Sequence, residues 1–108
     1  MKKIDLTSSE QLITIDKASF NQPQVLYKHS TTCGLCDIMW EEVIKGDFEL
    51  NYLDLHKYRP ISNEIEQKYN VQHESPQVLI IKDGKSVYNA SHRRINAAEI
   101  EKQIELYR

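Results

Sequence analysis

The sequence predicts an α/β fold in which helices flank a mixed central sheet. This prediction rests on two observations. Helical segments separate the first strand-like segments, which favours parallel neighbouring strands. Two later strand-like runs are joined by Asp83-Gly84, a pair typical of a tight antiparallel hairpin. At 108 residues the chain has room for one such domain, which we assign to residues 1–108.

The composition is that of an ordinary globular protein and argues against several kinds of partner. Hydrophobic residues make up 40% of the chain and charged residues 28%, and the net charge is −2. This charge is unsuited to sequence-independent binding of nucleic acid. We find neither a signal-peptide pattern nor an apolar run long enough to cross a membrane. With a single close pair of cysteines, these features predict a cytoplasmic protein with no nucleic-acid or membrane partner.

The first elements are predicted to be a strand and a helix. Residues 2–6 are a candidate first strand. Thr7 and Glu10 have the spacing of a capping box, which predicts a helix from about Ser8 to Phe20. The expected buried face of this helix consists of Leu12, Ile13, Ile15 and Phe20.

The next strand is predicted to lead directly into a second helix. After Pro23, residues 24–30 (QVLYKHS) are rich in strand formers. A helix is expected from Cys33 to the region of Gly46, a residue typical of helix ends. Its apolar residues at helical spacing are Leu35, Ile38, Met39, Val43 and Ile44.

The remaining elements alternate in the same way. Residues 48–55 predict a strand, and a short helix is expected between Ser62 as its cap and Asn70 near its end. The hairpin at residues 77–90 follows. The last helix is predicted to begin at Asn96, with Glu99 completing its cap. Its apolar face consists of Ile100, Ile104 and Tyr107.

Both cysteines lie in the segment HSTTCGLCD, at the predicted start of the second helix. A thiol attacks as thiolate, and an ordinary cysteine is mostly protonated at neutral pH. Free backbone amides and the helix dipole favour an anion at a helix start, which predicts Cys33 as the attacking thiol. Cys36 lies on the same helical face and within disulfide reach, so it is the expected resolving thiol. Gly34 has no Cβ and leaves room for a partner's backbone.

Two features near the cysteines leave alternatives open. Pro76 at the entrance of a strand indicates a bulge or a cis bond after Ser75, or else an ordinary trans proline. A cis bond would let this turn pack beside the Cys33 loop and present the Ser75 backbone to a substrate. His29 and Lys28 precede the helix, and His29 either tunes the thiol or lies on the surface.

The strand before the C-x-x-C motif, the SPQV segment and the Asp-Gly hairpin together resemble the thioredoxin superfamily over essentially the whole chain. YKHSTTC, HESPQVLIIKDGK and NASH are similar to the bacilliredoxin-like family of general-stress proteins. The resemblance implies a thioredoxin-like fold and a thiol-disulfide oxidoreductase that reduces mixed disulfides between client proteins and bacillithiol, a low-molecular-weight thiol. It also makes Cys33 the active cysteine and Pro76 the cis-proline.

The second cysteine departs from the pattern of this family. Members often have Thr-Cys-Pro followed by a serine, whereas this chain has Gly34 and Cys36 at those places. Dithiol chemistry is therefore available beside the monothiol route. We expect Thr32, Gly34, Ser75 and Pro76 to contact the substrate, with bacillithiol as co-substrate and with no bound cofactor or metal.

Three other functions remain as alternatives. A general dithiol reductase of the thioredoxin or glutaredoxin type would use the same cysteines. A metal-binding or iron–sulfur module would need further ligands, but no histidine has zinc-finger spacing. A non-enzymatic adaptor would not need an intact C-x-x-C at a helix start. Because bacillithiol carries carboxylates, Lys28 or the Arg93–Arg94 pair are the basic residues expected to bind them.

Overall fold

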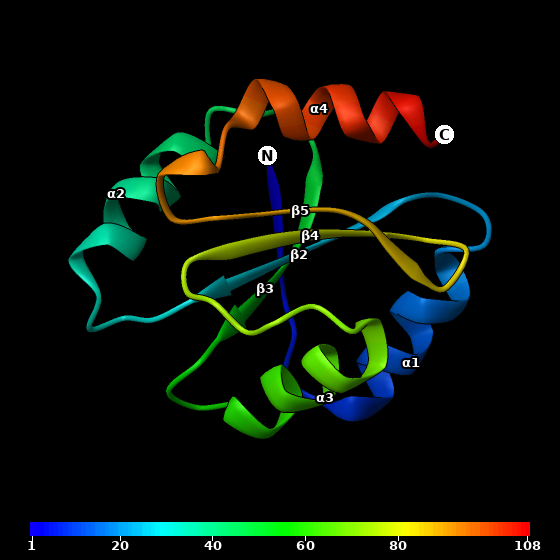
Figure 1. Ribbon diagram of the computed structural model, residues 1–108, viewed down its shortest axis with the longest axis horizontal. Helices are drawn as coiled ribbons and strands as arrows, with labels where there is room; N and C mark the ends of the chain where they lie inside the picture. The colour runs from blue at the N-terminus through cyan, green and yellow to red at the C-terminus, as the bar shows by residue number, and fades with distance from the viewer.

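The computed structural model describes residues 1–108 and contains the predicted mixed sheet (Figure 1). Its five strands are β1 (Lys2–Asp5), β2 (Gln24–His29), β3 (Glu49–Asp54), β4 (Gln77–Lys82) and β5 (Lys85–Ser91). The helices are α1 (Ser9–Ala18), α2 (Gly34–Val43), α3 (Arg59–Tyr69) and α4 (Ala97–Leu106), with a short 3₁₀ helix η1 (His92–Arg94). The strand order is β1-β3-β2-β4-β5. The first three of these are parallel, and β4 is antiparallel to both β2 and β5.

Two apolar cores cover the two faces of the sheet. Helices α1 and α3 pack on one face, and α2 and α4 pack on the other (Figure 1). Successive side chains of a strand point to opposite faces, so the central strand β2 contributes to both cores. Leu26 belongs to the core under α1 and α3, and Tyr27 to the core under α2 and α4. The same alternation sends Lys28 and His29 to opposite faces.

Helix α1 is capped one residue later than the capping-box spacing indicated. The Ser8 hydroxyl accepts a hydrogen bond from the Gln11 amide at 3.2 Å, and the Gln11 side chain accepts one from the Thr7 amide at 2.7 Å. The predicted burial of Ile13 and Phe20 is wrong, because their side chains are 51% and 58% exposed. Ile13 faces away from the sheet, and Phe20 lies beyond the last turn of the helix.

Two expectations for the middle helices are also corrected. Ile38 and Ile44 are exposed. Ile38 lies on the side of α2 that faces away from the sheet, and Ile44 lies just beyond the last residue of the helix. Helix α3 begins at Arg59, so Ser62 lies inside the helix and is buried rather than being its cap. Pro60 fits in the first turn, where a missing amide costs no helical hydrogen bond, and so lets α3 begin before Ser62.

The predicted hairpin turn, the end of α3 and the cap of α4 are confirmed. Asp83 and Gly84 both have positive φ angles, 54° and 74°, as a two-residue hairpin turn requires. Asn70 ends α3 in the left-handed conformation. The Asn96 side chain accepts a hydrogen bond from the Glu99 amide at 2.9 Å and so caps α4. None of the helices is both long and apolar enough to span a membrane.

Candidate active site

Cys33 occupies the N-cap of α2, directly after the loop that leaves β2. Its Sγ accepts a hydrogen bond from the Cys36 backbone amide at 3.3 Å. The sulfur therefore lies at the free amides and the positive end of the helix dipole. Hydrogen bonds from the Cys36 thiol and amide lower the pKa of Cys33. These contacts favour the thiolate that nucleophilic attack requires.

Cys36 lies one helical turn further along and is fully buried. Both cysteines are free thiols. Burial raises the pKa of Cys36, while a contact with the Ser75 hydroxyl, 3.3 Å from its Sγ, opposes this shift. The two thiols are thus chemically unequal. One is accessible and inclined to ionise, and the other is protected and stays protonated at neutral pH.

The Ser75–Pro76 bond is cis, and this loop packs beside the cysteines. No backbone hydrogen bond within the protein involves Ser75, so its amide and carbonyl are free to pair with an extended segment of a substrate. The Pro76 carbonyl, in contrast, accepts a hydrogen bond from the His92 amide at 3.0 Å. The arrangement has the form expected of a cis proline that presents the preceding residue to a substrate.

Thr32 and Gly34 flank Cys33, and both are exposed. A Cβ placed on Gly34 would meet no atom within 4 Å, so this position faces open space. The Thr32 hydroxyl lies 3.0 Å from His56 Nε2, and the Ser30 hydroxyl lies 3.3 Å from the same atom. His56 was not predicted to belong to the site. The available signal was its position just after β3, the parallel neighbour of β2.

His29 is not a surface residue, since only 4% of it is exposed. It lies under α2 in an aromatic cluster with Tyr27, Trp40 and Tyr52. Its Nε2 lies 3.5 Å from an Asp37 oxygen, while its Nδ1 has no partner. Burial lowers the pKa of His29. The imidazole is therefore neutral at neutral pH and joins β2 to α2 without adding a positive charge.

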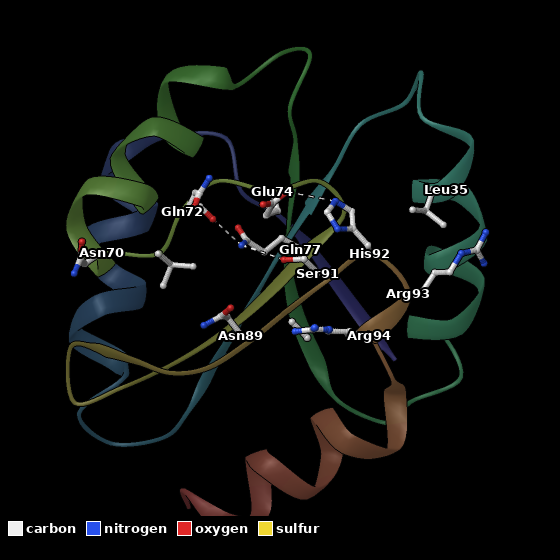
Figure 2. Close-up of a pocket in the computed structure, with 12 residues that line it drawn as sticks. Leu35, Asn70, Gln72, Glu74, Gln77, Asn89, Ser91, His92, Arg93 and Arg94 are labelled. Carbon is white, nitrogen blue, oxygen red and sulfur yellow. Dashed lines mark hydrogen bonds and ion pairs between the residues drawn. The ribbon is translucent and has the colours of Figure 1, made fainter.

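A groove of about 790 Å³ lies between the cis-proline loop and η1 (Figure 2). Leu35, one of the two residues between the cysteines, forms part of its wall. His92 Nε2 lies 3.4 Å from a Glu74 carboxylate oxygen across it. The Arg93 and Arg94 side chains extend in opposite directions, and so do not form a common clamp. Through Leu35, this groove therefore adjoins the C-x-x-C motif.

The further ligands that the metal-binding alternative requires are not found beside the cysteines. No group of three or more His, Cys, Asp or Glu side chains is placed to hold a metal ion. Lys28 is fully buried, so the expectation that it contacts a ligand directly is wrong.

Solved structures show the same fold over nearly the whole chain. A protein described as having a thioredoxin fold is 30% identical, with a TM-score of 0.83; the match covers 93% of this chain and 91% of that one. A thioredoxin from Nicotiana alata is 24% identical, with a TM-score of 0.69 and coverage of 99% and 93%. A thioredoxin from Malassezia sympodialis is 15% identical, with a TM-score of 0.73 and coverage of 99% and 90%.

A family model described as "Monothiol bacilliredoxin BrxC" matches residues 4–100. The chain belongs to this bacilliredoxin family. Together with the fold, the family makes the protein a thiol-disulfide oxidoreductase. Its partners are thiol-modified client proteins and a low-molecular-weight thiol. The family description specifies a monothiol enzyme, whereas this chain has a second cysteine at C-x-x-C spacing.

Proposed function

We propose that the protein reduces mixed disulfides between client proteins and bacillithiol, with Cys33 as the nucleophile. The observation that carries this proposal is the Cys33 sulfur at the N-cap of α2, with a lowered pKa and an accessible approach. The family match supports a low-molecular-weight thiol as the second substrate. No cofactor is required, because thiols supply the electrons.

In the first step, the Cys33 thiolate attacks the bacillithiol sulfur of the mixed disulfide. The bond between the client and bacillithiol breaks, a bond from Cys33 to bacillithiol forms, and the client leaves as a thiolate that takes a proton from water. Ser75 is the residue we assign to hold the substrate, since its backbone groups are free. Thr32, Gly34 and Pro76 complete the rim on which the substrate lies.

In the second step, a thiol must release bacillithiol from Cys33. A second bacillithiol can attack, leaving reduced Cys33 and bacillithiol disulfide. Alternatively, Cys36 loses its proton and attacks the Cys33 sulfur, which forms the Cys33–Cys36 disulfide and releases bacillithiol. That disulfide then needs two electrons from further thiol to return to the starting state. The high pKa of Cys36 slows this route, while its position makes it intramolecular.

The experiment compares three proteins on one bacillithiolated client: the wild type, Cys33→Ser and Cys36→Ser. We expect no client release with Cys33→Ser and continued release with Cys36→Ser when bacillithiol is present. Undiminished release by Cys33→Ser would contradict the proposal. The same client modified with glutathione or coenzyme A identifies the thiol that is preferred.

A general dithiol reductase is the second candidate, and the presence of Cys36 favours it. Such an enzyme would reduce ordinary protein disulfides through the Cys33–Cys36 pair. An equal rate on an intramolecular protein disulfide and on the bacillithiolated client would favour this activity over the proposed one.

A further inference from the structure

A second cavity, of about 360 Å³, lies on the α3 side of the cis-proline loop. Its lining is almost entirely polar: Ser30, Leu55, His56, Arg59, His73 and Ser75. We call this cavity the Arg59 pocket. Five of its six lining residues carry a hydroxyl, imidazole or guanidinium group, and none carries a carboxylate, which is the composition expected for an anion site.

Two residues that line the Arg59 pocket also contact the cysteines. The Ser75 hydroxyl, at its edge, lies 3.3 Å from the Cys36 sulfur. Ser30, at another edge, accepts a hydrogen bond from the Cys33 amide through its carbonyl at 3.2 Å. These contacts place the pocket next to the C-x-x-C motif.

Hydrogen-bond donors outnumber acceptors at the wall of the pocket. Arg59 Nη1 lies 3.0 Å from His73 Nε2, and Lys28 Nζ lies 3.2 Å from His73 Nδ1. A neutral imidazole accepts at one nitrogen only, while arginine and charged lysine are donors only. His73 can therefore satisfy just one of these two cations. Near this wall, one oxygen of the Glu66 carboxylate accepts a hydrogen bond from the His73 backbone amide at 2.6 Å.

The cations on this wall have no close acidic partner, although Glu66 is near enough to oppose the fall in the pKa of Lys28. Lys28 is fully buried, and neither it nor Arg59 forms an ion pair with a carboxylate. The N-terminus of α3, which starts at Arg59, has no side-chain cap to compensate its dipole. A buried lysine with no carboxylate at ion-pair distance, beneath an exposed arginine, is a costly arrangement that an anion in the pocket would relieve.

We propose that the Arg59 pocket binds a carboxylate of the low-molecular-weight thiol while its sulfur is bonded to Cys33. This inference rests on the proposed function and identifies the site that recognises the thiol. Arg59 would contact the carboxylate directly. Lys28 acts through His73, as a positioning residue, because it is buried beneath the wall.

The groove on the other side of the cis-proline loop is less suited to this carboxylate. Its lining includes the Glu74 carboxylate, which would repel a carboxylate ligand and which already contacts His92. Arg93 and Arg94 point apart in Figure 2, so they offer no bidentate clamp. The Arg59 pocket has no carboxylate in its lining, and its basic side chains face one cavity.

The test uses one client protein in two mixed disulfides, one with bacillithiol and one with 2-mercaptoethanol, which has no carboxylate. The readout is the ratio of kcat/KM for the two substrates. We expect Arg59→Gln to lower this ratio by about fivefold or more, since a charge-assisted hydrogen bond is lost. Lys57→Gln is the matched control, because Lys57 is exposed and lies outside the pocket. An unchanged ratio for Arg59→Gln, or an equal fall for Lys57→Gln, overturns the proposal.

Further arms separate the alternatives. A fall of the ratio in Arg94→Gln, with none in Arg59→Gln, would place the carboxylate in the other groove and overturn the proposal. Equal losses on both substrates in Arg59→Gln would assign Arg59 to the client and likewise overturn it. If the wild type reduces neither substrate, the proposed function fails. The pocket is then tested by NMR titration with malate, a small dicarboxylate, which needs no turnover. Malate should shift the amide resonances of Arg59 and His73 in the wild type but not those of Arg59→Gln, and an absence of shifts in the wild type contradicts the pocket.

Discussion

Two regions that meet at the end of β2 give the two cysteines opposite environments. At the exposed start of α2, Cys33 lies among free amides that favour its thiolate. Between α2 and the cis-proline loop, Cys36 is buried, and its pKa is raised. The three-residue spacing places both thiols on one face of α2, yet only one of them reaches solvent. The comparison shows that two positions one helical turn apart differ in solvent access and in the direction of their pKa shift.

The largest expected effect comes from removing the accessible thiol, that of Cys33. Cys33→Ser should lower client release by about a thousandfold or more, because a hydroxyl at this site is not an effective nucleophile. The measurement is single-turnover release of the bacillithiolated client. Cys36→Ser is the matched control, and similar losses in the two variants would show that the environments do not divide the roles.

Selective alkylation measures the difference between the thiols directly. We expect iodoacetamide to modify Cys33 about a hundredfold faster than Cys36 at pH 7, because Cys33 is accessible and its pKa is lowered. The rate for Cys33 should reach half its maximum below the pH typical of a free thiol. Peptide mass spectrometry over pH 5–10 gives both profiles, and coincident profiles would contradict the account.

These features differ in how far the sequence could predict them. The start of α2, the hairpin turn and the cap at Asn96 follow from neighbouring residues, so the local pattern was sufficient to find them. The burial of Lys28 and its contact with His73 depend on how α3 and the cis-proline loop pack against β2. Arg59 joins them only because α3 starts earlier than its cap pattern indicated. No residue spacing in the sequence predicts that these three side chains lie together.

The buried region can be tested through Lys28. Burial lowers its pKa from 10.5 to about 8, so between these values the unfolded chain binds more protons and the folded state is favoured as the pH rises. Below about pH 8 the buried charge destabilises the fold. Lys28→Met should therefore be more stable than the wild type there by about 1–2 kcal/mol, after allowance for solvent screening. This difference should vanish by about pH 10.5. Urea unfolding at several pH values measures this difference. A gain in stability that does not change with pH would show that the buried charge of Lys28 is not its cause.

The exposed region tolerates change, so the smallest effect is expected at Gly34. A proline fits the first position of α2, and Cys33 already has the extended conformation that a residue before proline adopts, with φ −105° and ψ 114°. Gly34→Pro should raise the free energy of unfolding by about 0.5 kcal/mol. In Gly46→Ala the new Cβ would instead collide with the Phe48 ring and destabilise the fold. A loss of stability in Gly34→Pro would show that residue 34 does not have an open, proline-compatible position.

The most direct measurement is mass spectrometry of Cys36→Ser after it reacts with a bacillithiolated client. The account predicts release of the client and one bacillithiol adduct on Cys33, which persists because no resolving thiol is present. Two results would contradict the assignment of Cys33 as the thiol that takes bacillithiol from its clients. One is the absence of any bacillithiol adduct, and the other is a stable disulfide between Cys33 and the client.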